Sequence, residues 1–209
     1  MKYFTFLFLM LTFYSCKDKY DYTSFENFSH RFKPIQVPIN FNDHYVFKEW
    51  SKNDLIDSAS VDKYELIESH VDKNLPIKNL REYQCSYIGR FGTKTYDVLL
   101  HKMKTGDTIG GKPKIILSTY SKDGKKKDEI IGLWSDDGNA EYTNATILKI
   151  VDSSKVEIKS IHRYSELKND QMVPGKIVLN MIKYDIQKDG KIIKIQEFSQ
   201  PVYKEDNQE

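Results

Sequence analysis

The feature that most constrains this fold is a series of segments between residues 83 and 198 in which apolar and polar side chains alternate. In the clearest of them, residues 155–163, the set Val156, Ile158, Ser160 and His162 alternates with Lys155, Glu157, Lys159 and Arg163. Successive side chains of a β-strand point to opposite faces, so this spacing gives each segment one face suited to a core and one suited to water. The pattern therefore predicts half-buried strands.

Short turns between these segments predict hairpins. Asp123-Gly124 and Asp189-Gly190 are turn dipeptides, and Asp152-Ser153-Ser154 connects another pair of segments. We expect an edge strand at 39–41, after two prolines, and further strands at 83–91, 96–100, 114–121, 129–134, 143–151, 155–163, 176–186 and 191–198. The predicted fold is mainly β: an antiparallel meander that forms a curled sheet, a half-barrel or a small sandwich.

Helices are expected only between residues 47 and 73. Ser51 is a candidate N-cap for a short turn over 54–56, and Asp62 is a candidate N-cap for a helix over 64–68. We expect one or two short N-terminal helices that cover an open end of the sheet. Residues 201–209 are polar and are expected to form a tail.

The first 15 residues have the features of a secretory signal peptide. Lys2 supplies a positive charge, and residues 3–13 form an apolar run too short to cross the roughly 30 Å of a bilayer core as a helix. Phe13-Tyr14-Ser15-Cys16 resembles a lipobox, the signal in which a small residue precedes a cysteine that is acylated. We expect acyl chains such as palmitate on Cys16, then a lipidated tether over 16–33 and a single β-rich domain over 34–200.

This assignment fixes an expected location in the cell envelope. Several acyl chains hold a protein firmly in one leaflet of a membrane. Residue 17 is Lys rather than Asp, so the best-known signal for retention in the inner membrane is absent, and the outer membrane is the expected site. Whether the domain faces the periplasm or the cell surface stays open.

Two hairpin segments carry a family resemblance. Residues 116–125 contain Tyr120-Ser121-Lys122-Asp123-Gly124-Lys125, and residues 184–192 contain Tyr184-Asp185-Ile186 followed by Asp189-Gly190-Lys191-Ile192. Together with the lipobox and residues 34–41, they resemble small uncharacterised lipoproteins of Bacteroidetes. The likeness covers most of residues 34–198. It implies an envelope location and supplies no activity, because its motifs are turn motifs rather than active-site motifs.

The charge distribution argues against a nucleic-acid partner. The formal net charge is +2, and acidic and basic residues are interleaved along the chain. The sharpest basic run, residues 125–127, is followed at once by Asp128 and Glu129, whereas nucleic-acid binders concentrate positive charge on one face. The expected partners are the membrane, through the acyl chains, and an envelope protein or glycan.

The sequence favours a protein without catalytic activity. None of its five histidines forms a His-Glu-x-x-His pair, and no Gly-x-Ser-x-Gly elbow is present. Cys85 is expected to be a buried thiol and His162 a partly buried residue of a sheet. We expect no cofactor. A hydrolase that uses His101 or His162 with nearby carboxylates is the lesser alternative.

Two sets of residues are weak candidates for ligand binding. Clustered oxygens that suit a loose Ca²⁺ site come from Asp136, Asp137, Asn139 and Glu141, although they do not match the spacing of an EF-hand loop and a tight turn is favoured. Trp50 and Trp134 are candidates for stacking on a sugar or peptide, although core positions are favoured.

These observations predict a membrane-anchored envelope lipoprotein that acts as a binding or scaffolding module. The alternative is a glycan- or peptide-binding accessory of an outer-membrane uptake system. That alternative requires exposed aromatic side chains that share one face.

Overall fold

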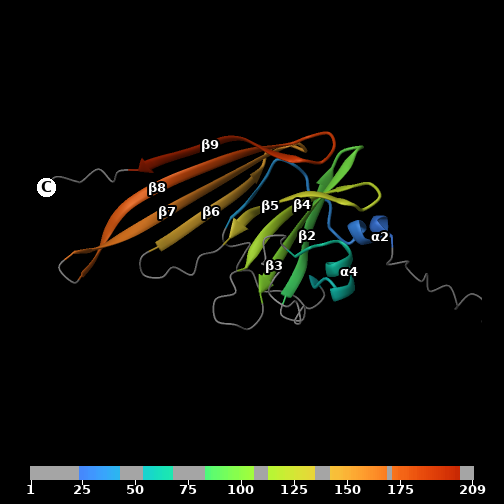
Figure 1. Ribbon diagram of the computed structural model, residues 1–209, viewed down its shortest axis with the longest axis horizontal. Helices are drawn as coiled ribbons and strands as arrows, with labels where there is room; N and C mark the ends of the chain where they lie inside the picture. The colour runs from blue at the N-terminus through green and yellow to red at the C-terminus, as the bar shows by residue number, and fades with distance from the viewer. Residues whose placement is uncertain are drawn as a thin grey trace, which may run out of the picture.

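The computed structural model describes residues 24–42, 54–67, 83–105, 113–134, 142–168 and 171–202, and within these ranges the chain forms two antiparallel sheets and two short helices (Figure 1). The elements are α2 (Phe25–His30), β1 (Ile39–Phe41), α4 (Ser58–Lys63), β2 (Tyr83–Gly92), β3 (Tyr96–Thr105), β4 (Lys114–Ser121), β5 (Lys126–Trp134), β6 (Tyr142–Ile150), β7 (Lys155–Lys168), β8 (Gln171–Ile186) and β9 (Ile192–Val202). One sheet has the order β1-β6-β7-β8-β9, and the other has the order β2-β3-β4-β5. The prediction of a mainly β, antiparallel fold with short helices is confirmed.

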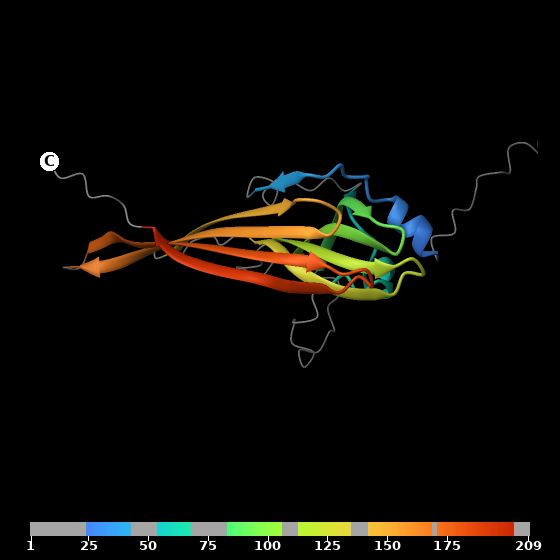
Figure 2. The same cartoon turned by 90° about the horizontal axis from the view of Figure 1, so that it is seen from above.

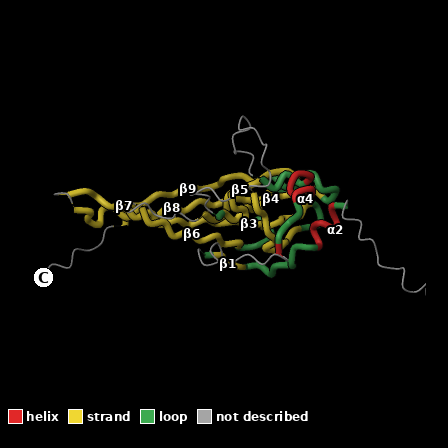
Figure 3. The backbone as a smooth tube through the Cα atoms, turned by 90° about the horizontal axis from the view of Figure 1, so that it is seen from below, coloured by secondary structure: helices red, strands yellow, loops and turns green. Residues whose placement is uncertain are grey.

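The four-stranded sheet is the middle layer of the molecule. On β3, Val98 and Leu100 pack into a core shared with the five-stranded sheet, whereas Leu99 and Met103 pack into a second core beneath the helices. Both faces of this sheet are therefore buried, and β4 is apolar in both phases of its alternation. Figures 2 and 3 show α2 and α4 on the side of this sheet that faces away from β6 to β9.

The turn predictions are confirmed. Gly124 and Gly190 both adopt a φ of +88°, in the left-handed region that favours glycine. The amide of each donates to the carbonyl three residues earlier, from Gly124 to Ser121 and from Gly190 to Gln187, at 2.9 Å. These two glycines reverse the chain between β4 and β5 and between β8 and β9.

Most predicted strands lie where the alternation places them, and the largest difference is the hairpin of β7 and β8. The predicted strands end at 163 and begin again at 176, because Pro174 and Gly175 interrupt the pattern. In the structure the pairing continues past a register shift between Arg163 and Ser165, and Pro174 pairs with Ser165. The irregular register accommodates the proline, so the hairpin is longer than predicted.

The predicted helix over 64–68 is wrong, although a short helix does occur in the expected region. Ser51, the other predicted N-cap, lies outside the described residues. The N-cap of α4 is Asp57, whose carboxylate accepts from the Ser60 amide at 2.9 Å, and Asp62 lies inside the helix. The helix ends at Tyr64, because Glu65 adopts a positive φ of 50°. Both helices cover a face of the four-stranded sheet rather than an open end.

The expected tether is also too long, because residues 24–33 belong to the folded domain. Phe25, Phe28 and Phe32 are buried, and the Phe28 ring stacks on Tyr64 with 4.1 Å between ring centroids. Their spacing of three and four residues is an apolar helical stripe, and the surrounding polar residues hide it. The remaining tether residues, 16–23, lie outside the described ranges.

Candidate functional site

The five-stranded sheet extends well beyond the four-stranded sheet. In Figures 1 and 2, strands β6 to β9 run past the ends of β2 to β5, away from α2 and α4, and the β7–β8 hairpin forms the far tip. The core between the two sheets includes Leu148, Ile158 and Ile186 but no residue nearer that tip. The far part of β6 to β9, which we call the extension, therefore contributes no residue to this core.

The register shows which side chains share a face in this sheet. Leu148, Ile158 and Ile182 are paired neighbours, and the first two are buried in the core, so this row faces the four-stranded sheet. We call this the inner face and the opposite one the outer face. Next to the core the outer face is polar, as expected for a sheet with one face in water; its row consists of Lys149, Glu157, Lys183 and Gln196.

Along the extension, the apolar residues change to the outer face. The next inner row is polar and consists of Thr146, Ser160, Asn180 and Ser199, of which Thr146 and Ser160 are still buried. The outer row beside it consists of Ile147, Lys159, Met181 and Phe198, and the next rows add Ile161, Leu179, Ile177 and Val202. We call the seven large apolar residues of these rows the outer apolar patch.

Three of the seven residues of the outer apolar patch are exposed to solvent, and the other four are half-buried. Ile147, Phe198 and Val202 are about 40 % exposed (41 %, 39 % and 45 %), and no described helix or strand packs over them. The other large exposed apolar residues, Ile193 and Ile195, both belong to β9. Single exposed apolar residues are common on proteins, but a continuous patch of them is typical of an interaction surface.

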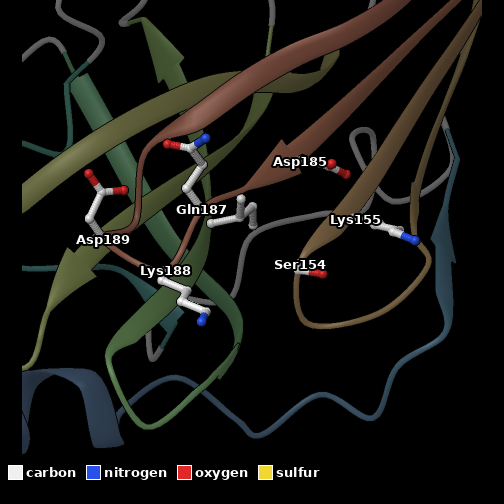
Figure 4. A pocket seen from close by; sticks show the side chains of 7 residues that line it. Ser154, Lys155, Asp185, Gln187, Lys188 and Asp189 are labelled. Carbon is white, nitrogen blue, oxygen red and sulfur yellow. The ribbon is translucent and has the colours of Figure 1, made fainter.

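A pocket of about 520 Å³ lies at the opposite end of this sheet, between the β6–β7 and β8–β9 turns (Figure 4). Its polar lining includes Ser154, Lys155, Asp185 and Asp189. The Ser154 hydroxyl donates to Asp152 at 2.9 Å, and no histidine or cysteine lines the pocket. The pocket therefore offers polar contacts to a small ligand, and a carboxylate rather than a histidine lies beside the Ser154 hydroxyl.

His101 is sealed beneath the helix layer. Its side chain is fully buried, and its Nε2 lies 2.8 Å from the Leu66 carbonyl oxygen, so Nε2 carries the proton and donates. Burial lowers the pKa of His101 from 6.5 to about 4, and the neighbouring Lys126 acts in the same direction. An imidazole that is buried in this way cannot reach a substrate at the surface.

His162 and Cys85 occupy the environments that the sequence predicts. His162 is half-buried on the inner face of β7, with its Nε2 3.0 Å from the Ser160 hydroxyl. Cys85 is buried against the helix layer, and burial raises the pKa of its thiol to about 12. A thiol with so high a pKa is a poor nucleophile near neutral pH.

Several predicted site residues lie outside the described ranges. They are Cys16, Trp50, Asp136, Asp137, Asn139 and Glu141, whereas Trp134 ends β5 and only its backbone is described. The calcium and stacking hypotheses therefore stay predictions. Among the residues that are described, no three His, Cys, Asp or Glu side chains are placed to hold a metal ion, and no helix is long and apolar enough to cross a membrane.

Comparison with protein-family models, with curated proteins and with solved structures found no match for this chain.

Sequence reasoning missed the outer apolar patch, although its signal is present in the sequence. In residues 177–182, apolar side chains occupy both phases of the alternation: Ile177, Leu179 and Met181 in one, Val178 and Ile182 in the other. A strand with only one buried face needs apolar residues in one phase. The apolar residues in the second phase therefore indicate a second apolar surface on this strand.

Proposed function

We propose that this protein is a membrane-anchored envelope module that binds another protein through the outer apolar patch. The observation that carries the proposal is the change of the apolar residues from the inner to the outer face where the sheet leaves the core. Burial of apolar area is the main favourable contribution to protein association, and Ile147, Phe198 and Val202 offer such area.

The shape of the molecule suits this role. Helix α2, the described element nearest Cys16 in sequence, lies at one end of the molecule, and the β7–β8 hairpin lies at the other (Figure 1). Acyl chains on Cys16 would hold the α2 end near the membrane and direct the extension away from it. A partner in the same compartment then meets the outer apolar patch first.

Binding is favoured over catalysis by the environments of the described reactive groups. His101 is buried, the Cys85 thiol has a raised pKa, and no histidine or cysteine lines the pocket in Figure 4. The polar rows beside the outer apolar patch carry both signs of charge, with a Lys149–Glu157 ion pair at 3.9 Å. A mixed rim of this kind fits a protein partner better than a uniformly charged polymer.

Site-specific photo-cross-linking in intact cells tests this proposal. A photoreactive residue at Phe198, within the outer apolar patch, is expected to give a cross-linked product of one defined mass. The matched control is the same residue at Lys188, which is exposed in the β8–β9 turn away from the patch. The substitution Ile147→Lys, on the neighbouring row, should abolish the product. Absence of any product at Phe198, or equal products at both positions, would contradict the proposal.

The anchor has its own test. We expect Cys16→Ser to move the chain from the membrane fraction to the soluble fraction of cells. The wild-type chain should have the mass of an acylated protein that begins at Cys16. A wild-type chain that retains residues 1–15 and no lipid would remove this part of the proposal.

A further inference from the structure

We propose that this chain also pairs with a second copy of itself through the free edge of β9, so that the two five-stranded sheets become continuous across a two-fold axis. This contact is distinct from the outer apolar patch, so the inference goes beyond the proposed function. Among the described elements β9 is an edge strand, since it pairs with β8 on one side only. An edge strand presents unpaired N–H and C=O groups that can pair with another strand.

The positions of the free backbone groups follow from the ladder. Pro201 has no N–H, and a proline within a ladder fits where its nitrogen faces away from the neighbouring strand. In an antiparallel ladder the backbone groups of successive residues face alternate sides of the strand. The backbone groups of Ser199 and Glu197 therefore face the free edge, as Pro201 does. A register shift between Lys183 and Tyr184 interrupts the alternation after Gln196.

On the other side of this shift, the amide of Ile192 faces away from β8, because it donates to the Asp128 carboxylate at 2.9 Å. Alternation then places the backbone groups of Lys194 at the free edge. The part of β9 that is free to pair therefore lies between Ile192, whose amide is bound by Asp128, and Pro201, which has no N–H. Lys194 and Glu197 lie within these limits.

One antiparallel register matches both the backbone and the side chains of this edge. With the two-fold axis between Ile195 and Gln196, Lys194 of one copy lies opposite Glu197 of the other, and both residues present free backbone groups. Opposite charges then face each other twice across the axis. In the single chain these two side chains form an exposed ion pair, with 2.6 Å between Nζ and Oε2.

The same register brings apolar side chains together. Ile193 lies opposite Phe198 of the other copy, and these side chains are 41 % and 39 % exposed in the single chain. Ile195, the most exposed of the large apolar residues at 55 %, lies beside the axis. The edge is thus complementary to itself in charge and in hydrophobicity, which singles out a second copy as its occupant.

A strand-to-strand contact of this length is a small interface. Anchoring by Cys16 would confine all copies to one membrane surface and raise their effective concentration. The outer apolar patches of the two copies would then form one continuous face.

Charge exchange at the two paired positions tests this proposal with the full-length chain in detergent micelles. We would measure association by sedimentation velocity up to about 100 µM, where a dimer with a Kd of about 10 µM predominates. Lys194→Glu places two carboxylates opposite each other, and Glu197→Lys places two ammonium groups opposite each other. Each variant alone should associate at least about tenfold more weakly than the wild type.

An equimolar mixture of the two variants should recover the dimer, because opposite charges then face each other at both contacts. The matched control is the pair Lys149→Glu and Glu157→Lys, which changes an ion pair on the outer face away from the edge. These two variants should dimerise like the wild type, separately and mixed. Circular dichroism verifies that every variant is folded.

The proposal is overturned if the wild type stays monomeric throughout the series, or if the two β9 variants dimerise as well separately as when mixed. Such a result leaves the proposed function to its own test, because a cross-linked product at Phe198 whose mass differs from twice that of the chain would identify a different partner. A product of twice the mass of the chain supports edge pairing, and the Ile147→Lys variant separates the two proposals, because Ile147 lies on β6, three strands from the free edge of β9.

Discussion

The burial of His101 leads to a pH dependence of stability that can be calculated. In the folded protein its pKa is lowered to about 4, mainly by desolvation, whereas in the unfolded chain it stays near the ordinary 6.5. The unfolded state therefore binds more protons below pH 6.5, so stability is complete above that value and falls as the pH falls toward 4. From about pH 7.5 to about pH 5 the expected loss of unfolding free energy is about 2 kcal/mol.

The substitution His101→Gln isolates this contribution. The amide nitrogen of glutamine can still donate to the Leu66 carbonyl, but it does not titrate. Urea unfolding at about pH 7.5 and about pH 5 should show that the wild type loses about 2 kcal/mol more than the variant does between the two conditions.

His30→Gln is the matched control, because His30 is exposed on α2. This variant should retain the pH dependence of the wild type. Equal losses for the wild type and His101→Gln would show that burial does not lower the pKa of His101, and would refute the reasoning about the sealed histidine.

Three further predictions concern the fold. Gly124→Ala should destabilise the protein by more than Gly190→Ala in thermal unfolding. Both residues have a φ of +88°, so the backbone strain of the two variants is similar. A Cβ at Gly124 would lie 2.5 Å from a phenylalanine side chain, whereas a Cβ at Gly190 would lie 3.2 Å from a lysine side chain. Tyr120→Phe should cost about 1 to 3 kcal/mol in urea unfolding, because the hydroxyl of Tyr120 donates to the buried Tyr64 carbonyl at 2.8 Å. Asp57→Ala should cost about 1 kcal/mol at neutral pH, and less as the pH falls through the lowered pKa of Asp57, because the cap of α4 is then lost in the wild type as well.

The sequence predicts the strands well because local chemistry specifies them. The β4 segment carries β-branched and aromatic residues between turn residues, and its predicted and observed bounds, 114–121, coincide. Asp123-Gly124 and Asp189-Gly190 require no tertiary information to form turns. The burial of both faces of the four-stranded sheet follows from apolar residues in both phases of β3 and β4.

The helices and the interaction surface could not be placed by the same local reasoning. Asp57 is the N-cap of α4 because the residues that follow it pack, together with Tyr64, against the four-stranded sheet. By sequence alone, Asp62 is an equally good N-cap. The outer apolar patch depends on how far one sheet extends beyond the other, and this follows from the register of β7 and β8. The apolar residues in both phases of residues 177–182 indicate a second apolar face, but they do not show where that face lies relative to the other sheet.

The central claim is that the outer apolar patch is covered by a protein partner when the chain is at its membrane. Cysteine labelling measures this directly, because Cys85 is buried with a raised pKa and should contribute little background. We predict that Phe198→Cys reacts slowly with a polar maleimide in intact envelopes and rapidly once the chain is purified and diluted, whereas Lys188→Cys reacts rapidly in both. Equally rapid labelling of Phe198→Cys in both preparations would contradict the claim.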